Sequence, residues 1–310
     1  MKERILYRTI FCCWYAVSKL PACIHYFNSL WISALLFHVI RYRRRLVHRQ
    51  MKASFPEKSD KELWRLERRF YLHFCDILAE SVMYFAMSKE EIMRRMRFVN
   101  AETIRASASK GRNIGIYLGH YANWEWVSSF SLWTEGTCTV AQLYHPLENP
   151  VFDKLVGYTR QRFGSVNVSV NESVRMIMKL KQQDRPVLVG FIADQAPFWN
   201  NIHYWTPFLN HPETPVFTGA EKLMKKLDMD VYYLDIRQLR RGYYEAEFIP
   251  ITDKPREQPE YAITERYTRL LEQSITKSPS LWLWSHNRWK RTKEEWLKMY
   301  DPKTGKVFMG

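Results

Sequence analysis

The residues best suited to chemistry in this sequence are His120 and Glu125, in the segment GIYLGHYANWEW at positions 115–126. An imidazole that donates one ring N–H to a carboxylate has a fixed tautomer and a more basic second nitrogen. That second nitrogen can remove a proton from a hydroxyl group, which is general-base catalysis. The segment therefore predicts that His120 is a general base and that Glu125 contacts and orients it.

The positions of the two residues in the chain allow such a contact. His120 directly follows an apolar run typical of a strand, and Glu125 lies in the helix expected next. Residues at this spacing on one ideal helix do not face each other, but a histidine at the strand–helix junction is free of helical geometry. No Ser or Cys stands beside His120 as an activated nucleophile, so we expect no covalent intermediate.

The elements around this segment follow an α/β pattern. Short apolar runs rich in β-forming residues occur at 113–118, 138–144 and 186–193, with helical stretches between them. Two further runs, 231–239 and 243–251, are expected to pair as an antiparallel hairpin across Arg240, Arg241 and Gly242. The sequence therefore predicts a mixed, mostly parallel sheet flanked by helices.

Three segments show apolar residues at helical spacing, namely 59–87, 88–96 and 261–278. Ser59 precedes Glu62 by three residues, and Ser88 precedes Glu91 in the same way. This spacing is the capping-box pattern of a helix N-terminus. We expect the first two helices to shield the site or to touch lipid.

The N-terminal region is apolar and aromatic from residue 5 to residue 40, and residues 21–40 carry no formal charge. That stretch is long enough to cross a bilayer, although His25, Asn28 and His38 weaken it as a span. Spanning and lying in the interface both remain open, and a buried amphipathic helix of the globular domain is the alternative. We predict a membrane-anchor region at 1–45 and an enzymatic domain at 46–310.

Two observations favour a membrane location, and the first of them favours a retained anchor over a cleaved signal peptide. Four arginines, at positions 41 and 43–45, follow the apolar stretch with no small-residue cleavage site, and such arginines face the cytoplasm. The chain has 47 Lys and Arg against 32 Asp and Glu, a net charge of +15, together with 12 Trp, 18 Tyr and 17 Phe. The charge predicts an anionic partner, and the aromatic rings favour a membrane surface. No nucleic-acid-binding motif is present.

The segment around His120 resembles the late acyltransferases of lipid A biosynthesis, the lauroyl and myristoyl transferases related to the lysophospholipid acyltransferase superfamily. Their signature is H-x4-D/E in a GHFGNWE-like setting. The matching residues are Gly119, His120, Asn123, Trp124 and Glu125, with Ala122 in place of the usual glycine. Further matches are Tyr144, Pro146, Asn149, Pro150, Asp153, Arg160, Gly164, the pair Asp194 and Gln195, Thr214, Pro215, Gly219 and the segment PSLWLWSHNRWK at 279–290.

The resemblance implies a glycerol-3-phosphate acyltransferase-like fold at the cytoplasmic face of the bacterial inner membrane, with no cofactor and no metal. It implies transfer of a fatty acyl group from acyl carrier protein to a hydroxyl on a 3-hydroxyacyl chain of a lipid A precursor. Coenzyme A is the weaker alternative donor. The implied catalytic residues are His120 and Glu125. The implied substrate-binding residues are Arg160, Asp194, Asn123 and Gln195.

Several interpretations stay open from the sequence alone. Aromatic residues near His120 either line an apolar groove for the acyl chain or belong to the core; they are Trp124, Trp126, Phe130 and Trp133. The acyl acceptor is alternatively a lysophospholipid or an aminoacyl lipid. From other functional classes, the alternatives are a non-catalytic basic membrane scaffold and a basic nucleic-acid-binding protein.

Overall fold

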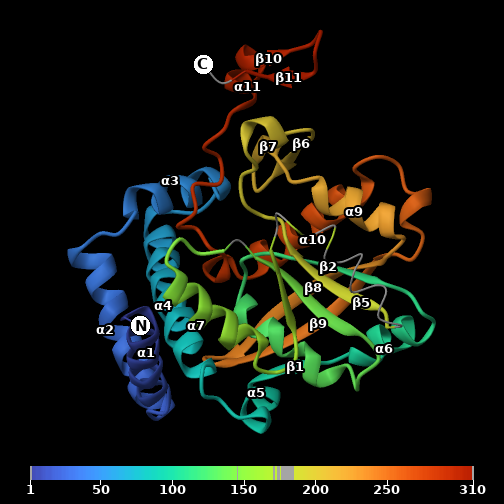
Figure 1. Ribbon diagram of the computed structural model, residues 1–310. Helices are drawn as coiled ribbons and strands as arrows, with labels where there is room; N and C mark the ends of the chain where they lie inside the picture. Colours follow the sequence, from blue (N-terminus) through green and yellow to red (C-terminus); the bar gives the residue numbers. More distant parts are fainter. Residues whose placement is uncertain (1, 145, 170–171, 173–174, 176–184, 309–310) are drawn as a thin grey trace.

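The computed structural model describes residues 2–144, 146–169, 172, 175 and 185–308, and its centre is a seven-stranded sheet in the order β1-β9-β8-β2-β5-β3-β4 (Figure 1). All neighbouring strands are parallel except β8 and β9. The predicted mixed, mostly parallel sheet is therefore confirmed. The strands are β1 (Met96–Phe98), β2 (Ile114–Leu118), β3 (Thr139–Tyr144), β4 (Val166–Ser169), β5 (Val187–Ile192), β8 (Asp230–Arg240) and β9 (Tyr243–Thr252).

The five strands predicted from apolar runs are all present, and the predicted hairpin is β8–β9. Its turn contains Gly242 with a φ of 75°, a left-handed conformation that glycine adopts without strain. Strands β1 and β4 were not predicted; they are short and lie at the two edges of the sheet. A strand of three or four residues is too short to show a period.

Helices cover the sheet, and the predicted capping at Ser59 and Ser88 is confirmed. Ser59 and Glu62 form a reciprocal capping box, and the Ser88 hydroxyl accepts a hydrogen bond from the Glu91 backbone N–H at 3.1 Å. The helices that flank the sheet are α4 (Asp60–Tyr84), α5 (Lys89–Arg95), α6 (Ala101–Ser109), α7 (Pro150–Gln161), α9 (Gly219–Leu227) and α10 (Ala262–Lys277).

The N-terminal helices lie against α4 on one side of the molecule (Figure 1). They are α1 (Lys2–Ser18), α2 (Ala22–Ala34), the π-helical turn η1 (Leu35–Val39) and α3 (Arg44–Ser54). The segment Ala22–Val39 has a mean hydropathy of 1.3 and is long and apolar enough to cross a membrane, by length and composition only. Only 22% of it is buried, so it is not a core helix of the domain.

The chain continues beyond β5 into a small ribbon and a C-terminal extension. The ribbon pairs β6 (Trp205–Phe208) with β7 (His211–Pro215), and the extension contains η6 (Pro279–Leu281), α11 (Lys293–Met299), β10 (Tyr300–Asp301) and β11 (Lys306–Val307).

The register of the two central strands positions the site. Leu118 at the end of β2 pairs with Ile192 at the end of β5. Because parallel strands end at the same edge of a sheet, the residues that follow these two strands come close together. One of these residues is His120 and the other is Asp194.

Candidate active site

The imidazole of His120 is bound by the carboxylate of Asp194. The Nδ1 atom of His120 lies 2.6 Å from Oδ1 of Asp194, and the backbone N–H of His120 donates to Oδ2 at 2.8 Å. Gly119 allows this approach, because a Cβ there would lie 3.2 Å from Asp194 Oδ2 and 2.8 Å from Leu271 Cδ1. Two contacts between the same two residues fix both the position and the rotation of the ring.

Asp194 is a buried negative charge, with 2% of its side chain exposed. The indole Nε1–H of Trp282 donates to Oδ2 at 2.8 Å. Burial alone raises the pKa of Asp194, but the attraction of His120 and the hydrogen bonds from His120 and Trp282 lower that pKa to about 2. The carboxylate is therefore ionised at neutral pH and can only accept hydrogen bonds.

The proton on the His120 ring follows from its partners. Because Asp194 only accepts, Nδ1 of His120 carries the proton, and Nε2 keeps its lone pair when the ring is neutral. The side-chain amide of Gln195 lies 3.3 Å from this Nε2 and can donate to it. The His120 side chain is 20% exposed and lines a cavity, so Nε2 is placed to take a proton from a bound molecule.

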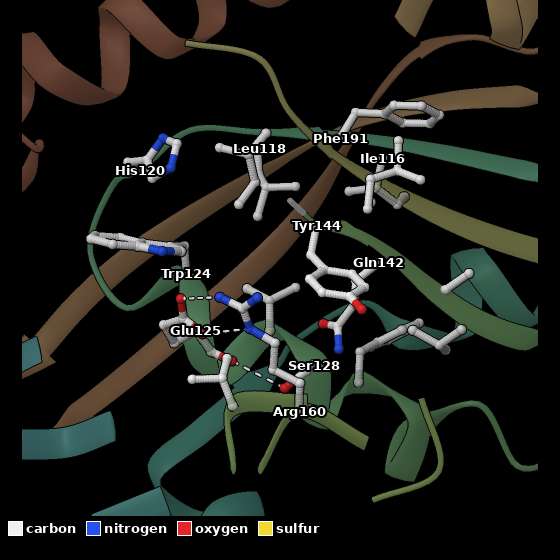
Figure 2. A pocket seen from close by; sticks show the side chains of 18 of the residues that line it. Ile116, Leu118, His120, Trp124, Glu125, Ser128, Gln142, Tyr144, Arg160 and Phe191 are labelled. Carbon is white, nitrogen blue, oxygen red and sulfur yellow. Dashed lines mark hydrogen bonds and ion pairs between the residues drawn. The ribbon is translucent and has the colours of Figure 1, made fainter. Parts of the chain in front are cut away.

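The predicted contact between His120 and Glu125 is not present, because Glu125 is bound to Arg160 instead. The Arg160 guanidinium donates from Nη2 to Glu125 Oε1 at 2.6 Å and from Nε to Oε2 at 3.0 Å. Figure 2 shows the Trp124 ring between His120 and Glu125 in that view. Ala122 has a φ of 50°, a left-handed backbone conformation. The 3₁₀ helix η2 (Trp124–Trp133) begins two residues later and places Glu125 next to Arg160 of α7.

Asn123 also has a role that differs from the predicted one. Its side chain is 1% exposed, and its Oδ1 atom accepts a hydrogen bond from the backbone N–H of Trp126 at 3.1 Å. Its Nδ2 atom donates to Glu80 Oε2 at 2.6 Å. Both ends of the amide are thus used inside the protein, so Asn123 caps η2 and does not face a substrate.

A cavity of about 750 Å³ opens beside His120 (Figure 2). Its walls are mostly apolar and come from β2, β3, β5 and α7, while its polar groups include His120, Glu125, Arg160 and Gln195. Of the aromatic residues proposed for a groove, Trp124 and Phe130 line it. Trp126 is fully buried in the core and Trp133 is not part of the lining. A volume of this size suits a small-molecule or acyl-chain site.

The pKa values of Arg160 and His286 shift in opposite directions, so Arg160 is charged at neutral pH and His286 is neutral. Burial lowers the pKa of Arg160, but the charge and hydrogen bonds of Glu125 outweigh it and leave that pKa raised. Burial and the charge of Lys290 lower the pKa of His286 to about 4. Neutral His286 accepts a hydrogen bond from the Ala196 backbone N–H at 3.2 Å, so it supports the chain after Asp194.

Comparisons with known proteins identify the family to which this chain belongs. Residues 4–291 match the family model described as bacterial lipid A biosynthesis acyltransferase. The chain belongs to that family. A lipid A biosynthesis acyltransferase from Haemophilus influenzae is 22% identical over 278 residues, which are 88% of this chain and 82% of that protein. The lipid A biosynthesis lauroyltransferase of Escherichia coli is 21% identical over 280 residues, which are 90% of this chain and 89% of that protein.

This acyltransferase has two site residues that the sequence patterns did not single out. Trp282 supports Asp194 from the C-terminal segment 279–290, where only the resemblance marked it. Glu80 lies on the buried face of α4 and accepts hydrogen bonds from Asn123, Tyr26 and Tyr244. An acidic residue on the apolar face of a predicted helix was the available signal for Glu80.

Replacing Asp194 with Asn should nearly abolish acyl transfer while preserving the fold. The oxygen of the new amide would take the two N–H donors now on Oδ2, so its NH₂ group would donate to Nδ1 of His120 and move the ring proton to Nε2. We expect kcat to fall by roughly 10³-fold or more with little change in KM. The control is Asp253→Asn at an exposed position, and a kcat within a few-fold of wild type in Asp194→Asn would contradict this role.

The stability of the acyltransferase should depend on pH through Glu80. Burial raises the pKa of Glu80 from 4.5 to about 7 despite three hydrogen-bond donors. An acid whose pKa is raised in the folded state stabilises the fold at low pH and loses that contribution as pH rises through about 7. From about pH 5 to about pH 8, wild type should lose about 2 kcal/mol of unfolding free energy relative to Glu80→Gln. Denaturant titrations followed by tryptophan fluorescence measure the unfolding free energy of both proteins at each pH. If the two free energies change with pH in the same way, Glu80 does not make this contribution.

Proposed function

We propose that this enzyme transfers a fatty acyl group from acyl carrier protein to a hydroxyl on a 3-hydroxyacyl chain of a lipid A precursor. The observation that carries the proposal is the position of the Nε2 atom of His120, the ring nitrogen not held by Asp194, beside an apolar cavity. A base next to a long apolar slot matches a reaction between a hydroxyl and an acyl thioester. The membership of the lipid A biosynthesis acyltransferase family supports the acceptor class.

In the proposed reaction, Nε2 of His120 removes the proton of the acceptor hydroxyl as its oxygen attacks the thioester carbonyl carbon. The new C–O bond forms, the C–S bond breaks, and the imidazolium returns its proton to the departing thiolate. Asp194 stabilises the imidazolium because its negative charge lies 2.6 Å from Nδ1 in a buried position. The base is therefore a His120–Asp194 pair, in place of the His120–Glu125 pair expected from the sequence.

We assign Glu125 and Arg160 to the stabilisation of charge on the cavity wall. Glu125 binds the Nε and Nη2 atoms of Arg160 and so fixes the plane of the guanidinium. A guanidinium has five N–H donors, so others remain for the developing oxyanion or a phosphate oxygen. A donor aimed at an oxyanion contributes roughly 3 kcal/mol to transition-state stabilisation.

Charge supports acyl carrier protein as the donor. The net charge of +15 would attract an acidic protein and orient it before docking. Coenzyme A is a smaller anion and offers less charged surface for such an attraction. The exposed arginines and the apolar N-terminal helix support a reaction at the cytoplasmic face of the bacterial inner membrane.

The direct test uses purified enzyme, acyl carrier protein loaded with chains of different length, and a tetra-acylated lipid A precursor. Mass spectrometry should show a product heavier by one acyl group, and His120→Ala should lower the rate by at least roughly 10³-fold. The exposed His203 supplies the matched control, since His203→Ala should behave as wild type. Acylation of a lysophospholipid but not of the precursor would overturn the acceptor assignment.

The length of acyl chain accepted should change at Gly190, which lines the cavity on β5. A Cβ at this position would make only ordinary contacts, at 3.8 Å from Leu118 Cδ2, so Gly190→Ala should fold and keep the wild-type chain preference. Gly190→Leu would place a larger side chain in the cavity and should shift the preferred donor to shorter chains. Each methylene excluded removes about 0.8 kcal/mol of burial. An unchanged chain preference in Gly190→Leu would place the acyl chain elsewhere.

A further inference from the structure

Helix α2 has the reverse polarity of a surface helix in a water-soluble domain. The side chains it buries against the protein are polar, namely His25, Ser29 and Ser33. Its outward side chains, with those of η1, are large and apolar, and Trp31 and Val39 are 65% and 71% exposed. The main members of this outer face are Phe27, Leu30, Trp31, Leu35, Val39 and Ile40. An exposed apolar surface of this extent marks an interaction site.

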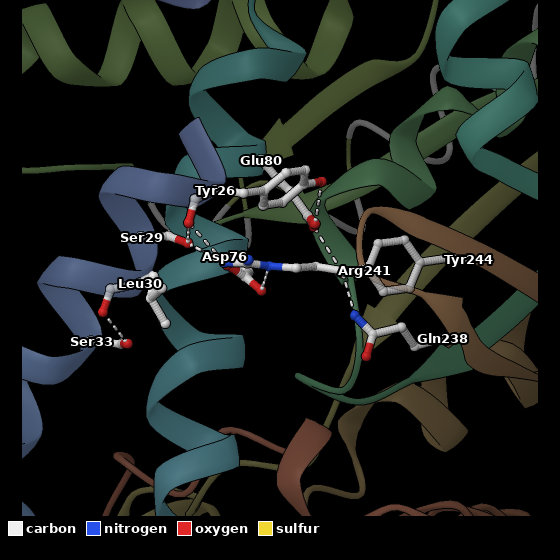
Figure 3. Close-up of polar contacts among 9 residues, drawn as sticks. All are labelled: Tyr26, Ser29, Leu30, Ser33, Asp76, Glu80, Gln238, Arg241 and Tyr244. Carbon is white, nitrogen blue, oxygen red and sulfur yellow. Dashed lines mark hydrogen bonds and ion pairs between the residues drawn. The ribbon is translucent and has the colours of Figure 1, made fainter. Parts of the chain in front are cut away.

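Charged and polar groups hold α2 on α4 (Figure 3). Asp76 of α4 accepts a hydrogen bond from Ser29 of α2 and two from Arg241 of the β8–β9 turn, at 2.6 and 2.8 Å. Glu80, one turn further along α4, accepts a hydrogen bond from Tyr26 of α2 at 3.0 Å. We call these five residues the polar seam.

The polar seam restricts what α2 can do at a membrane. If α2 left α4 to cross a bilayer, Asp76 and Glu80 would lose hydrogen bonds, and Ser29 would enter the hydrocarbon without its partners. If α4 and the β8–β9 turn followed α2 into the bilayer, the ion pair of Asp76 with Arg241 would be carried with them. Either route is costly, whereas contact with one leaflet leaves the seam intact.

Arginines border the outer face where η1 ends. Arg41, Arg43 and Arg45 are exposed, and with Arg44 they line an open cavity of about 850 Å³ whose lining also includes Trp64 and the carboxylates of Asp60 and Glu67. Glu67 pairs with Arg44, so the arginines outnumber the carboxylates at this border. Within the described part of the chain, no ion pair is formed by Arg41 or Arg45. Guanidinium groups bind phosphate oxygens, and Trp rings favour the membrane interface.

We propose that the outer face of α2 and η1 is buried in one leaflet of an anionic bilayer, with the arginine border on the headgroup phosphates and α2 retained on α4. The enzyme is then held on the membrane without crossing it. This inference rests on the membrane location in the proposed function, but it needs neither the catalytic residues nor the acyl donor.

Vesicle flotation tests the surface. Full-length protein diluted from detergent onto vesicles of phosphatidylcholine with phosphatidylglycerol should float, and the double variant Phe27→Ser, Trp31→Ser should reduce the bound fraction at least 10-fold. The matched control is Leu297→Ser, Phe308→Ser, since those side chains are 56% and 58% exposed on the C-terminal extension. Arg41→Ala with Arg45→Ala should weaken binding to anionic vesicles and leave binding to pure phosphatidylcholine unchanged. Equal flotation of the Phe27, Trp31 variant and its control would overturn the proposal.

Thiol labelling tests whether α2 crosses. With Cys12, Cys13 and Cys23 changed to Ser, a single Leu20→Cys in the turn between α1 and α2 is compared with Leu297→Cys in right-side-out and inverted membrane vesicles. We expect an impermeant maleimide to reach both positions from the same side. Labelling of Leu20→Cys from the opposite side, or protection from both sides, would contradict the proposal. Loss of acyl transfer with flotation and labelling unchanged would contradict the proposed function alone.

Discussion

The carboxylate of Asp194 is kept ionised in the interior by hydrogen bonds from the ring of His120, the backbone of His120 and the indole of Trp282. Loss of any donor would leave part of a buried charge unpaired, so the three groups are constrained together. The constraint explains the parallel register of β2 with β5, the glycine at 119, and the return of the C-terminal segment to the site. It also leaves Nε2 of His120 as the ring atom open to the cavity.

A second buried carboxylate holds the other end of the same loop. Glu80 accepts a hydrogen bond from Asn123, which caps the helix that carries Trp124 and Glu125. The chain between His120 and Asn123 passes through a positive φ at Ala122, and such a conformation persists only where its surroundings determine it. Because Glu80 also binds Tyr26 of α2, helix α2 and the loop of the active site share one supporting side chain.

The strands, the hairpin and the capped helices were predictable because their signals are local, as at Ser59 and in the run that became β8. The place of His120 after an apolar strand and beside a cavity was also predictable, from the apolar run before it and from the resemblance. Its carboxylate partner was not, because Asp194 is 74 residues away in sequence and meets His120 only through strand register. Glu125 was closer in sequence, but the turn at Ala122 and the charge of Arg160 direct it elsewhere.

The position of the proton on the His120 ring is the most direct test of the His120–Asp194 pair. Nitrogen-15 NMR of protein labelled at histidine, with the signal assigned by its loss in His120→Gln, reports which ring nitrogen carries the proton. For the neutral form of the ring, we predict a proton at Nδ1 in wild type and in Glu125→Gln, and a proton at Nε2 in Asp194→Asn. A wild-type ring protonated at Nε2, or a tautomer that changes in Glu125→Gln and not in Asp194→Asn, would contradict it.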